Sequence, residues 1–202
     1  MLPCPSRMTR RRRGLRNIDG VRLAALERAL RGGDPELIPQ HAAEALGKTR
    51  AGLRLLFAVM AARNSPELRE AAVYGLSWCR SKPPVRSLLL RVFEDPREGP
   101  RVRGQAAEGL GPYVQNQSPR RKLQRRHLRL VRALVRGLDD PSPDVRLWSI
   151  FALAHPQNAW LLPKLAEMAN DQAMVPGWWT VRQEALWAAN WIQGIDSDPQ
   201  KL

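Results

Sequence analysis

The sequence contains little cysteine and little histidine. Among its 202 residues there are two cysteines, Cys4 and Cys79, and three histidines, His41, His127 and His155. The cysteines are far apart in the chain, and no histidine stands at metal-ligand spacing from a second ligand. These shortages exclude a disulfide framework and predict no metal site, which fits the reducing environment of a cytoplasm.

Long hydrophobic runs are also missing. The longest uninterrupted apolar run, residues 55–62, has eight residues, whereas about 18 are needed to cross a bilayer. The basic N-terminus is not followed by the apolar stretch of a secretory signal, and Met8 is an alternative start to Met1. We therefore expect a cytoplasmic protein without a membrane partner.

Motifs that carry catalysis are scarce as well. The sequence has no glycine-rich phosphate loop, no clustered cysteines, and no nucleophile with a base at motif spacing. We accordingly predict no catalytic residues and no cofactor. A non-enzymatic protein is favoured, and enzymatic activity stays open.

What the sequence does have is positive charge, concentrated in two segments. The net charge is +14; residues 1–16 hold six arginines and no acid, and residues 120–136 hold eight cations and no acid. The remainder is balanced. Because blocks of like charge are usually disordered, residues 1–16 are predicted to be a disordered basic tail.

A second feature is a block that recurs along the chain. Each copy begins with an aliphatic residue followed by arginine, and it places small or apolar residues four, seven and eight positions later. These offsets share one face of a helix, so each block predicts an amphipathic helix. The starting residues are Leu68, Val102, Val145 and Val181, with a fainter copy at Ile38. A second apolar-periodic segment precedes each copy, over residues 18–31, 50–63, 84–94, 120–138 and 159–169.

The pairing of these segments predicts an all-α fold of about five helix pairs. The solenoid is expected to span residues 17–195 and to be followed by a C-terminal tail, residues 196–202. Proline at the first helical position supports three of the helix starts. The positions predicted to be buried are Val102, Ala106, Leu110, Val145, Leu153, Val181 and Ala185.

The third copy carries a specific resemblance. A turn acid, Asp95, is followed by Pro100, Val102 and Arg103, and then by Ala106, Ala107, Leu110 and Gly111. This order resembles the bacterial HEAT repeat of phycobilisome-lyase-type proteins. The resemblance implies a right-handed α-solenoid of about five HEAT-like pairs, and it says little about function because such arrays serve many partners. It also implies that the arginine after each aliphatic residue bonds turn acids of a neighbouring repeat, and these arginines are Arg69, Arg103, Arg146 and Arg182.

An aromatic column is the first candidate for recognition. Positions three, six and ten after the aliphatic residue fall on a narrow arc beside the packing face of the second helices. The third copy interrupts the arc with Gln105 and Glu108. In HEAT arrays the second helices line the concave wall, so these rings are expected to form a strip along a groove, although packing between helices explains the same pattern. The rings are Tyr74, Trp78, Trp148, Phe151, Trp187 and Trp191.

A basic face is the second candidate. Five arginines of residues 120–138 share one side of the predicted helix, opposite its leucines, and nothing in the flanking sequence neutralises them. This pattern predicts a ridge that binds nucleic acid or an acidic protein, or else a solvated face in an arginine-rich chain. The five are Arg121, Arg125, Arg129, Arg132 and Arg136.

Together these features favour a HEAT-repeat scaffold that binds another protein along its concave surface. The alternative is nucleic-acid binding, as in HEAT-like DNA glycosylases, although no catalytic motif matches. A bilin-lyase-like chaperone is a third possibility, suggested by the repeat family alone. The sequence favours no particular oligomeric state.

Overall fold

The computed structural model describes residues 19–34, 37–62, 65–79, 83–115 and 125–201. Over these residues the regular structure is helical and contains no β-strand, which confirms the predicted all-α class. One short hairpin in these residues forms an isolated β-bridge between Met174 and Thr180, which is too short to count as a strand. The predicted N-terminal tail, residues 1–16, lies outside the described residues.

Ten α-helices alternate between two sets in these segments. The first set comprises α1 (Gly20–Leu30), α3 (Arg50–Ala61), α5 (Pro83–Glu94), α8 (Arg125–Gly137) and α10 (Leu162–Met168), the last preceded by the 3-10 turn η1 (Ala159–Leu161). The second set comprises α2 (Pro39–Gly47), α4 (Pro66–Ser77), α6 (Pro100–Gln115), α9 (Pro143–Leu153) and α11 (Val181–Ile192). A second 3-10 turn, η2 (Pro199–Lys201), follows α11. Each recurring block of the sequence is one helix of the second set.

Local capping explains where these helices begin. The hydroxyl of Ser65 accepts a hydrogen bond from the backbone N–H of Leu68, and Pro66 occupies the first turn of α4. Thr49 caps α3 in the same way, through the N–H of Gly52 at 3.0 Å. These side chains satisfy N–H groups that a helix N-terminus would otherwise leave unpaired.

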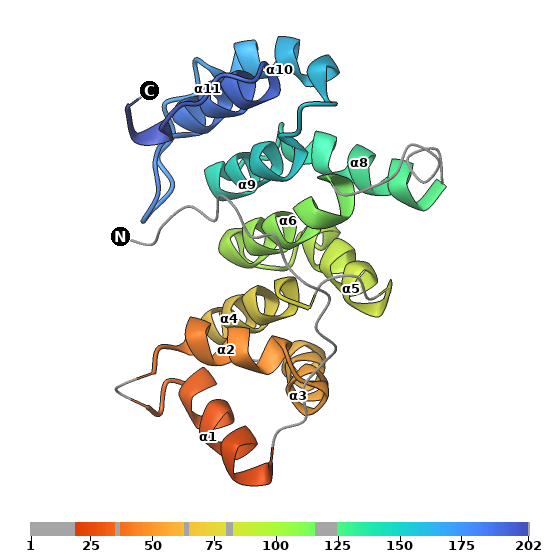
Figure 1. Cartoon of the computed structure of the whole chain (residues 1–202), viewed down its shortest axis with the longest axis vertical. Helices are drawn as coiled ribbons and strands as arrows, with labels where there is room; N and C mark the ends of the chain where they lie inside the picture. Colours follow the sequence, from red (N-terminus) through yellow and green to blue (C-terminus); the bar gives the residue numbers. More distant parts are fainter. Residues whose placement is uncertain (1–18, 35–36, 63–64, 80–82, 116–124, 202) are drawn as a thin grey trace.

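Helices of the second set pack on one another in chain order. α2 contacts α4, α4 contacts α6, α6 contacts α9, and α9 contacts α11, and Figure 1 shows α4, α6 and α9 stacked with α3, α5 and α8 alongside. Glycine permits the closest approach, because a Cβ built on Gly75 would lie 2.5 Å from the carbonyl oxygen of Ala43. This row of second helices carries the candidate site.

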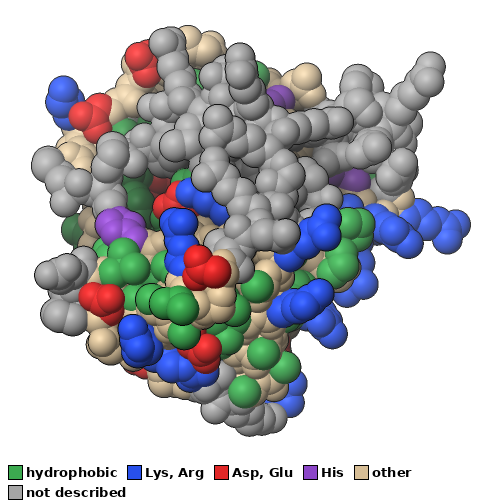
Figure 2. All heavy atoms as spheres, turned by 60° about the horizontal axis from the view of Figure 1, so that its bottom comes forward, with side chains coloured by type: hydrophobic (Ala, Val, Ile, Leu, Met, Phe, Trp, Pro, Cys, Tyr) green, Lys and Arg blue, Asp and Glu red, His purple; other side chains and the backbone are tan. Residues whose placement is uncertain are grey.

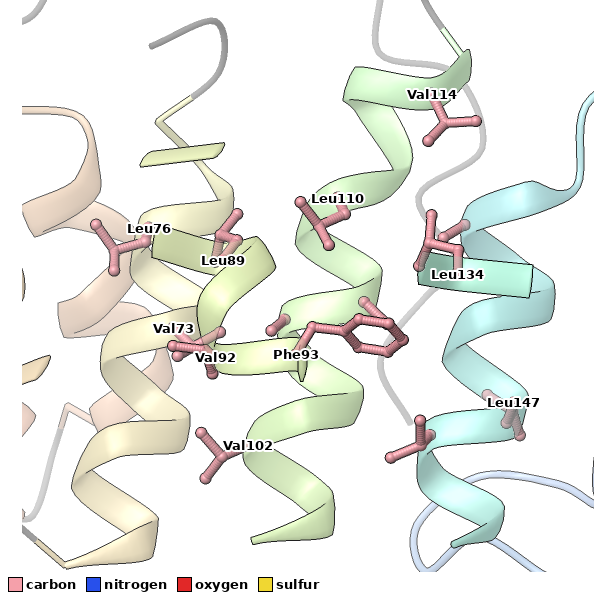
Figure 3. Packing of buried hydrophobic residues seen from close by; sticks show 14 of the residues in the cluster. Val73, Leu76, Leu89, Val92, Phe93, Val102, Leu110, Val114, Leu134 and Leu147 are labelled. Carbon is pink, nitrogen blue, oxygen red and sulfur yellow. The ribbon is translucent and has the colours of Figure 1, made fainter. Parts of the chain in front are cut away.

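The core lies between the two sets. Figure 3 shows Leu89, Val92 and Phe93 of α5 between α4 and α6, and all three side chains are buried. The ring of Phe93 extends toward Gly137 of α8, where an added Cβ would collide with it. Each side chain that the sequence predicts as buried is buried, and the set is Val102, Ala106, Leu110, Val145, Leu153, Val181 and Ala185.

Candidate functional site

A hairpin between α10 and α11 positions two tryptophans. The backbone N–H of Val175 donates to the carbonyl oxygen of Trp179 at 3.3 Å, and Gly177 turns the chain with a φ of 84°. A positive φ suits glycine because it has no Cβ to clash with the backbone. The turn places Trp178 and Trp179 immediately before α11.

The start of α11 is fixed by a capping box. The hydroxyl of Thr180 accepts the N–H of Gln183, and the side chain of Gln183 accepts the N–H of Thr180 at 3.0 Å. This reciprocal pair satisfies two N–H groups at the start of the helix. On this helix Glu184 bonds Trp179 of the hairpin, and Trp187 stacks on Phe151 of α9.

Aromatic rings from α9, the hairpin and α11 contact one another in a chain. Trp148 meets Trp178 edge-on, with centroids 4.8 Å apart and planes at 83°, and it meets Phe151 at 5.6 Å and 81°. Phe151 stacks on Trp187 at 6.1 Å, and Trp187 stacks on Trp191 at 6.3 Å. These distances are those of favourable aromatic pairs.

These rings surround a small pocket with a cavity volume of about 30 Å³. Its accessible walls are almost entirely carbon, because the polar atoms of the lining residues are covered. We call it the aromatic pocket, and it is lined by Glu108, Leu147, Trp148, Phe151, Trp178, Trp179, Glu184, Trp187 and Pro199.

Glu184 supplies the first carboxyl group. Its side chain is only 1% exposed, and Oε2 accepts the indole N–H of Trp179 at 2.7 Å. Burial raises the pKa of Glu184 to about 8, although the bond from Trp179 acts in the opposite direction. Oε1 has no hydrogen-bond partner among the described residues.

Glu108 of α6 supplies the second carboxyl group. Burial raises the pKa of Glu108 to about 7, and a hydrogen bond from the amide of Gln105 opposes that shift. Neither carboxyl group is paired with a cationic side chain in the described part of the chain. Two protonatable acids therefore lie beside an apolar pocket.

A second aromatic cluster lies toward the N-terminal end. Tyr74 and Trp78 meet edge-on at 6.0 Å. The ammonium group of Lys48 lies 5.2 Å from the centre of the Trp78 ring and is also paired with Glu44. The Lys48 cation thus contacts both the Trp78 ring and the Glu44 carboxylate.

The predicted aromatic column is thus two clusters, separated by Gln105 and Glu108 of α6. Tyr74, Trp148 and Trp187 are partly buried and pack against the core, so these rings contribute to packing between helices. Six residues that line the pocket were not among the predicted site residues: Glu108, Leu147, Trp178, Trp179, Glu184 and Pro199. Glu184 occupies position three of the fifth copy, so the arc itself could have identified it.

The predicted C-terminal tail also contributes to the site. Pro199 of η2 is buried and lines the aromatic pocket. Within this segment η2 contacts α11.

The predicted basic face is exposed on α8. Arg125, Arg129, Arg132 and Arg136 are exposed, whereas Arg121 lies outside the described residues. Basic side chains gather at the right-hand edge of Figure 2, on the side where Figure 1 places α5 and α8. Two of these arginines are paired, because Glu94 of α5 lies 3.0 Å from Arg129 and 2.8 Å from Arg136. The acid comes from a neighbouring pair and not from the flanking sequence.

The four repeat arginines bond turn groups. Their guanidinium groups donate to carbonyl oxygens at the ends of the first helices or in the turns, such as Phe93 for Arg103 at 3.0 Å and Ala169 for Arg182 at 3.3 Å. Three of them also pair with an acid of the next repeat. These pairs are Arg69 with Glu98, Arg103 with Asp140 and Arg146 with Asp171.

The described segments also lack two further functional signals. They contain no group of three or more His, Cys, Asp or Glu side chains placed to hold a metal ion. Within the same segments no helix is long and apolar enough to cross a membrane. Neither a protein-family model nor a curated protein matches the sequence.

Proposed function

We propose that the chain is a right-handed, HEAT-like helical array that acts as a non-enzymatic adaptor and binds another protein through the face that carries the aromatic pocket. The five helix pairs and the row of second helices support the array. Repeat arrays of this kind use one extended face of stacked second helices for binding.

The observation that carries the proposal is the exposure of aromatic rings in and next to the aromatic pocket. Trp191 is 46% exposed and Trp178 is 37% exposed, and both contact the partly buried rings beneath them. Tryptophan is enriched in protein interfaces because it offers a large, rigid contact area with a polar edge. A rigid aromatic surface of this type suits a protein partner.

The proposal is tested by recovering the partner with matched tryptophan variants. Tagged wild type, the double variant W178A/W191A and the control W160A are purified from the native cells after nuclease treatment. Trp160 is 53% exposed, and its indole bonds Asn158 outside the pocket. We expect the control to keep a partner that the double variant loses; recovery of the same proteins with all three refutes the proposal.

Nucleic-acid binding is the second candidate. It is favoured by the exposed arginines of α8, since phosphate contacts by arginine need no base-specific geometry. The pairing of Arg129 and Arg136 with Glu94 weakens the case, because part of the positive charge is already compensated.

A further inference from the structure

The two sets of helices differ in charge. In the middle of the chain the first-set helices α3, α5 and α8 hold nine arginines and one acid, Glu94. The second-set helices α4, α6 and α9 hold four arginines and four acids. Figure 1 shows α3, α5 and α8 on one side of the row formed by α4, α6 and α9. An arginine-rich composition alone does not explain this separation, because it would enrich both sets.

The positive charge is most concentrated in a groove along α8. The groove has a volume of about 530 Å³, and α5 contributes Glu94 to its wall. Its four arginines are exposed, whereas Leu130 and Leu134 of the same helix are buried, so packing of the leucines directs the arginines outward. We call it the basic groove, and it is lined by Glu94, Arg125, Leu128, Arg129, Arg132 and Arg136.

Glu94 compensates only part of the charge of the basic groove. One of its carboxylate oxygens pairs with Arg129 and the other pairs with Arg136. No carboxylate of the described residues forms an ion pair with Arg125 or Arg132. Like charges four residues apart on a helix repel one another, so an anion from outside would relieve that repulsion.

We propose that the basic groove binds duplex DNA through its phosphate backbone. This inference goes beyond the proposed function, because it adds a second binding surface on the other set of helices. DNA is then an additional ligand and not an alternative to the protein partner. An adaptor with both surfaces would hold its protein partner on DNA.

Charge density favours a duplex over an acidic protein. The four arginines of the basic groove are spaced four, three and four residues apart, so they form a row roughly 16 Å long. Duplex DNA carries one negative charge for about every 1.7 Å of its axis, so each arginine can face a phosphate. A protein interface needs an apolar centre, and Leu128 is the sole apolar side chain among the described residues that line the groove.

Two other polyanions fit this surface less well. Single strands are held by aromatic rings on which their bases stack, and the exposed side chains of α5 and α8 include no aromatic ring. A membrane surface is bound through apolar side chains that enter it, whereas Leu130 and Leu134 are buried in the core. Guanidinium groups donate hydrogen bonds and accept none, so we expect contacts to phosphate that do not depend on base sequence.

The experiment titrates a labelled DNA duplex of about 20 base pairs with the full-length protein and follows fluorescence anisotropy. Neutralising about four phosphates should weaken binding at least on the order of 100-fold between about 50 and 200 mM salt. Three unlabelled competitors are compared with the duplex at equal charge: the matching single strand, polyglutamate, and phosphatidylserine vesicles. Each should compete at least about tenfold less well, and duplex RNA should compete about as well as duplex DNA, as a backbone contact requires.

Variants assign the binding to the basic groove. R125Q/R132Q removes the two unpaired arginines, so it should bind the duplex at least about tenfold more weakly and flatten the plot of log affinity against log salt by about 2. The arginines of residues 1–16 are the same in wild type and variant, so the difference reports the groove. R22Q/R28Q is the matched control, because it makes the same charge change on α1, which contacts α2, α3 and α4.

E94Q provides a test in the opposite direction. It removes the acid of the groove and frees Arg129 and Arg136 for phosphate, so the duplex should bind severalfold more tightly. Unchanged or weaker binding by E94Q would overturn the inference. Equal affinity and salt dependence for wild type and R125Q/R132Q would overturn it as well, and so would polyglutamate or vesicles that compete as strongly as the duplex.

The two binding surfaces can be tested separately. W178A/W191A should bind the duplex as wild type does, and R125Q/R132Q should still recover the protein partner after nuclease treatment. Duplex binding in the groove without any recovered partner refutes the proposed function alone. A recovered partner without duplex binding that depends on Arg125 and Arg132 refutes this inference alone.

Discussion

Carboxyl groups have different partners in two regions of the molecule: the turn edge, formed by the turns that hold Asp140 and Asp171, and the aromatic pocket. At the turns, Asp140 meets Arg103 at 2.6 Å and Asp171 meets Arg146 at 2.7 Å, so each carboxylate is neutralised inside the chain. In the aromatic pocket, Glu108 and Glu184 meet only an amide and an indole. Paired acids connect neighbouring repeats. The two pocket carboxyl groups have no cation to stabilise their ionised form, so burial raises their pKa values and favours the protonated form.

The largest effect on stability is expected when the ionisable group of Glu184 is removed by the substitution E184Q. The folded protein holds the Glu184 proton more tightly than the unfolded chain, because the pKa of Glu184 is raised from 4.5 to about 8. Stability from this group is therefore complete below about pH 4.5 and is lost as the pH rises through about 8. At pH 9, E184Q should be more stable than wild type by up to about 4 kcal/mol relative to their difference at pH 5.

Urea unfolding followed by circular dichroism at pH 5 and pH 9 measures that difference. Glu108 shifts in the same direction, so some pH dependence should survive in E184Q and vanish in E108Q/E184Q. Parallel pH profiles for wild type and both variants would contradict the burial argument.

The next effect unpairs a carboxylate at the turn edge. R103A removes the partner of Asp140 and the hydrogen bond to the carbonyl oxygen of Phe93. Removing one member of a largely buried pair costs about 3 kcal/mol, since the remaining charge stays unpaired. Urea unfolding at pH 7 provides the measurement.

The control for R103A is R97A, in which an arginine 76% exposed loses its pairing with Asp95. An exposed pair contributes under about 1 kcal/mol, so this variant should be nearly as stable as wild type. Equal losses in the two variants would mean that the turn pairs do not join the repeats.

A smaller stability effect is expected for the exposed ring next to the pocket. W191A removes an exposed ring that stacks on Trp187, so the free energy of unfolding should fall by about 1 kcal/mol or less. Affinity for a protein partner should fall by more than about 1–2 kcal/mol, as for an interface anchor. Thermal melting and partner titration of one preparation separate these roles, and a large stability loss would make Trp191 a packing residue.

The smallest stability effect concerns the basic face of α8. R125E/R129E/R132E alters exposed charges, each worth under about 0.5 kcal/mol. If nucleic acid is bound there, its affinity should fall and its salt dependence should flatten. Gel shifts at about 50 and 200 mM salt test this; no wild-type binding to DNA or RNA at the lower salt removes that candidate.

Periodicity was sufficient to predict the helices and most of the core. The spacing after Val102 or Val145 places apolar residues on one helix face, and that face can be buried only against another helix. The start of a helix could also be predicted where Ser65 and Pro66 provide an N-terminal cap. This part of the structure depends on local pattern, which one sequence contains in full.

The aromatic pocket could not be predicted in the same way. Trp178 and Trp179 belong to a hairpin outside the repeat pattern, and Glu108 interrupts the predicted aromatic column. It enters the pocket because α6 packs directly on α9, a contact between residues about 40 positions apart. Buried acids look like surface acids until the packing of the second helices is known.

The side chain of Gln115 has a consequence for how the chain can be divided. Its amide nitrogen, at the end of α6, lies 3.2–3.3 Å from the carbonyl oxygens of Phe151, Ala152 and Ala154, which close α9. A helix terminus in one repeat is thus completed by the repeat before it. A fragment beginning at α8 would fray at α9, so the repeat boundary seen in the sequence is not a place where the protein can be cut into self-sufficient pieces.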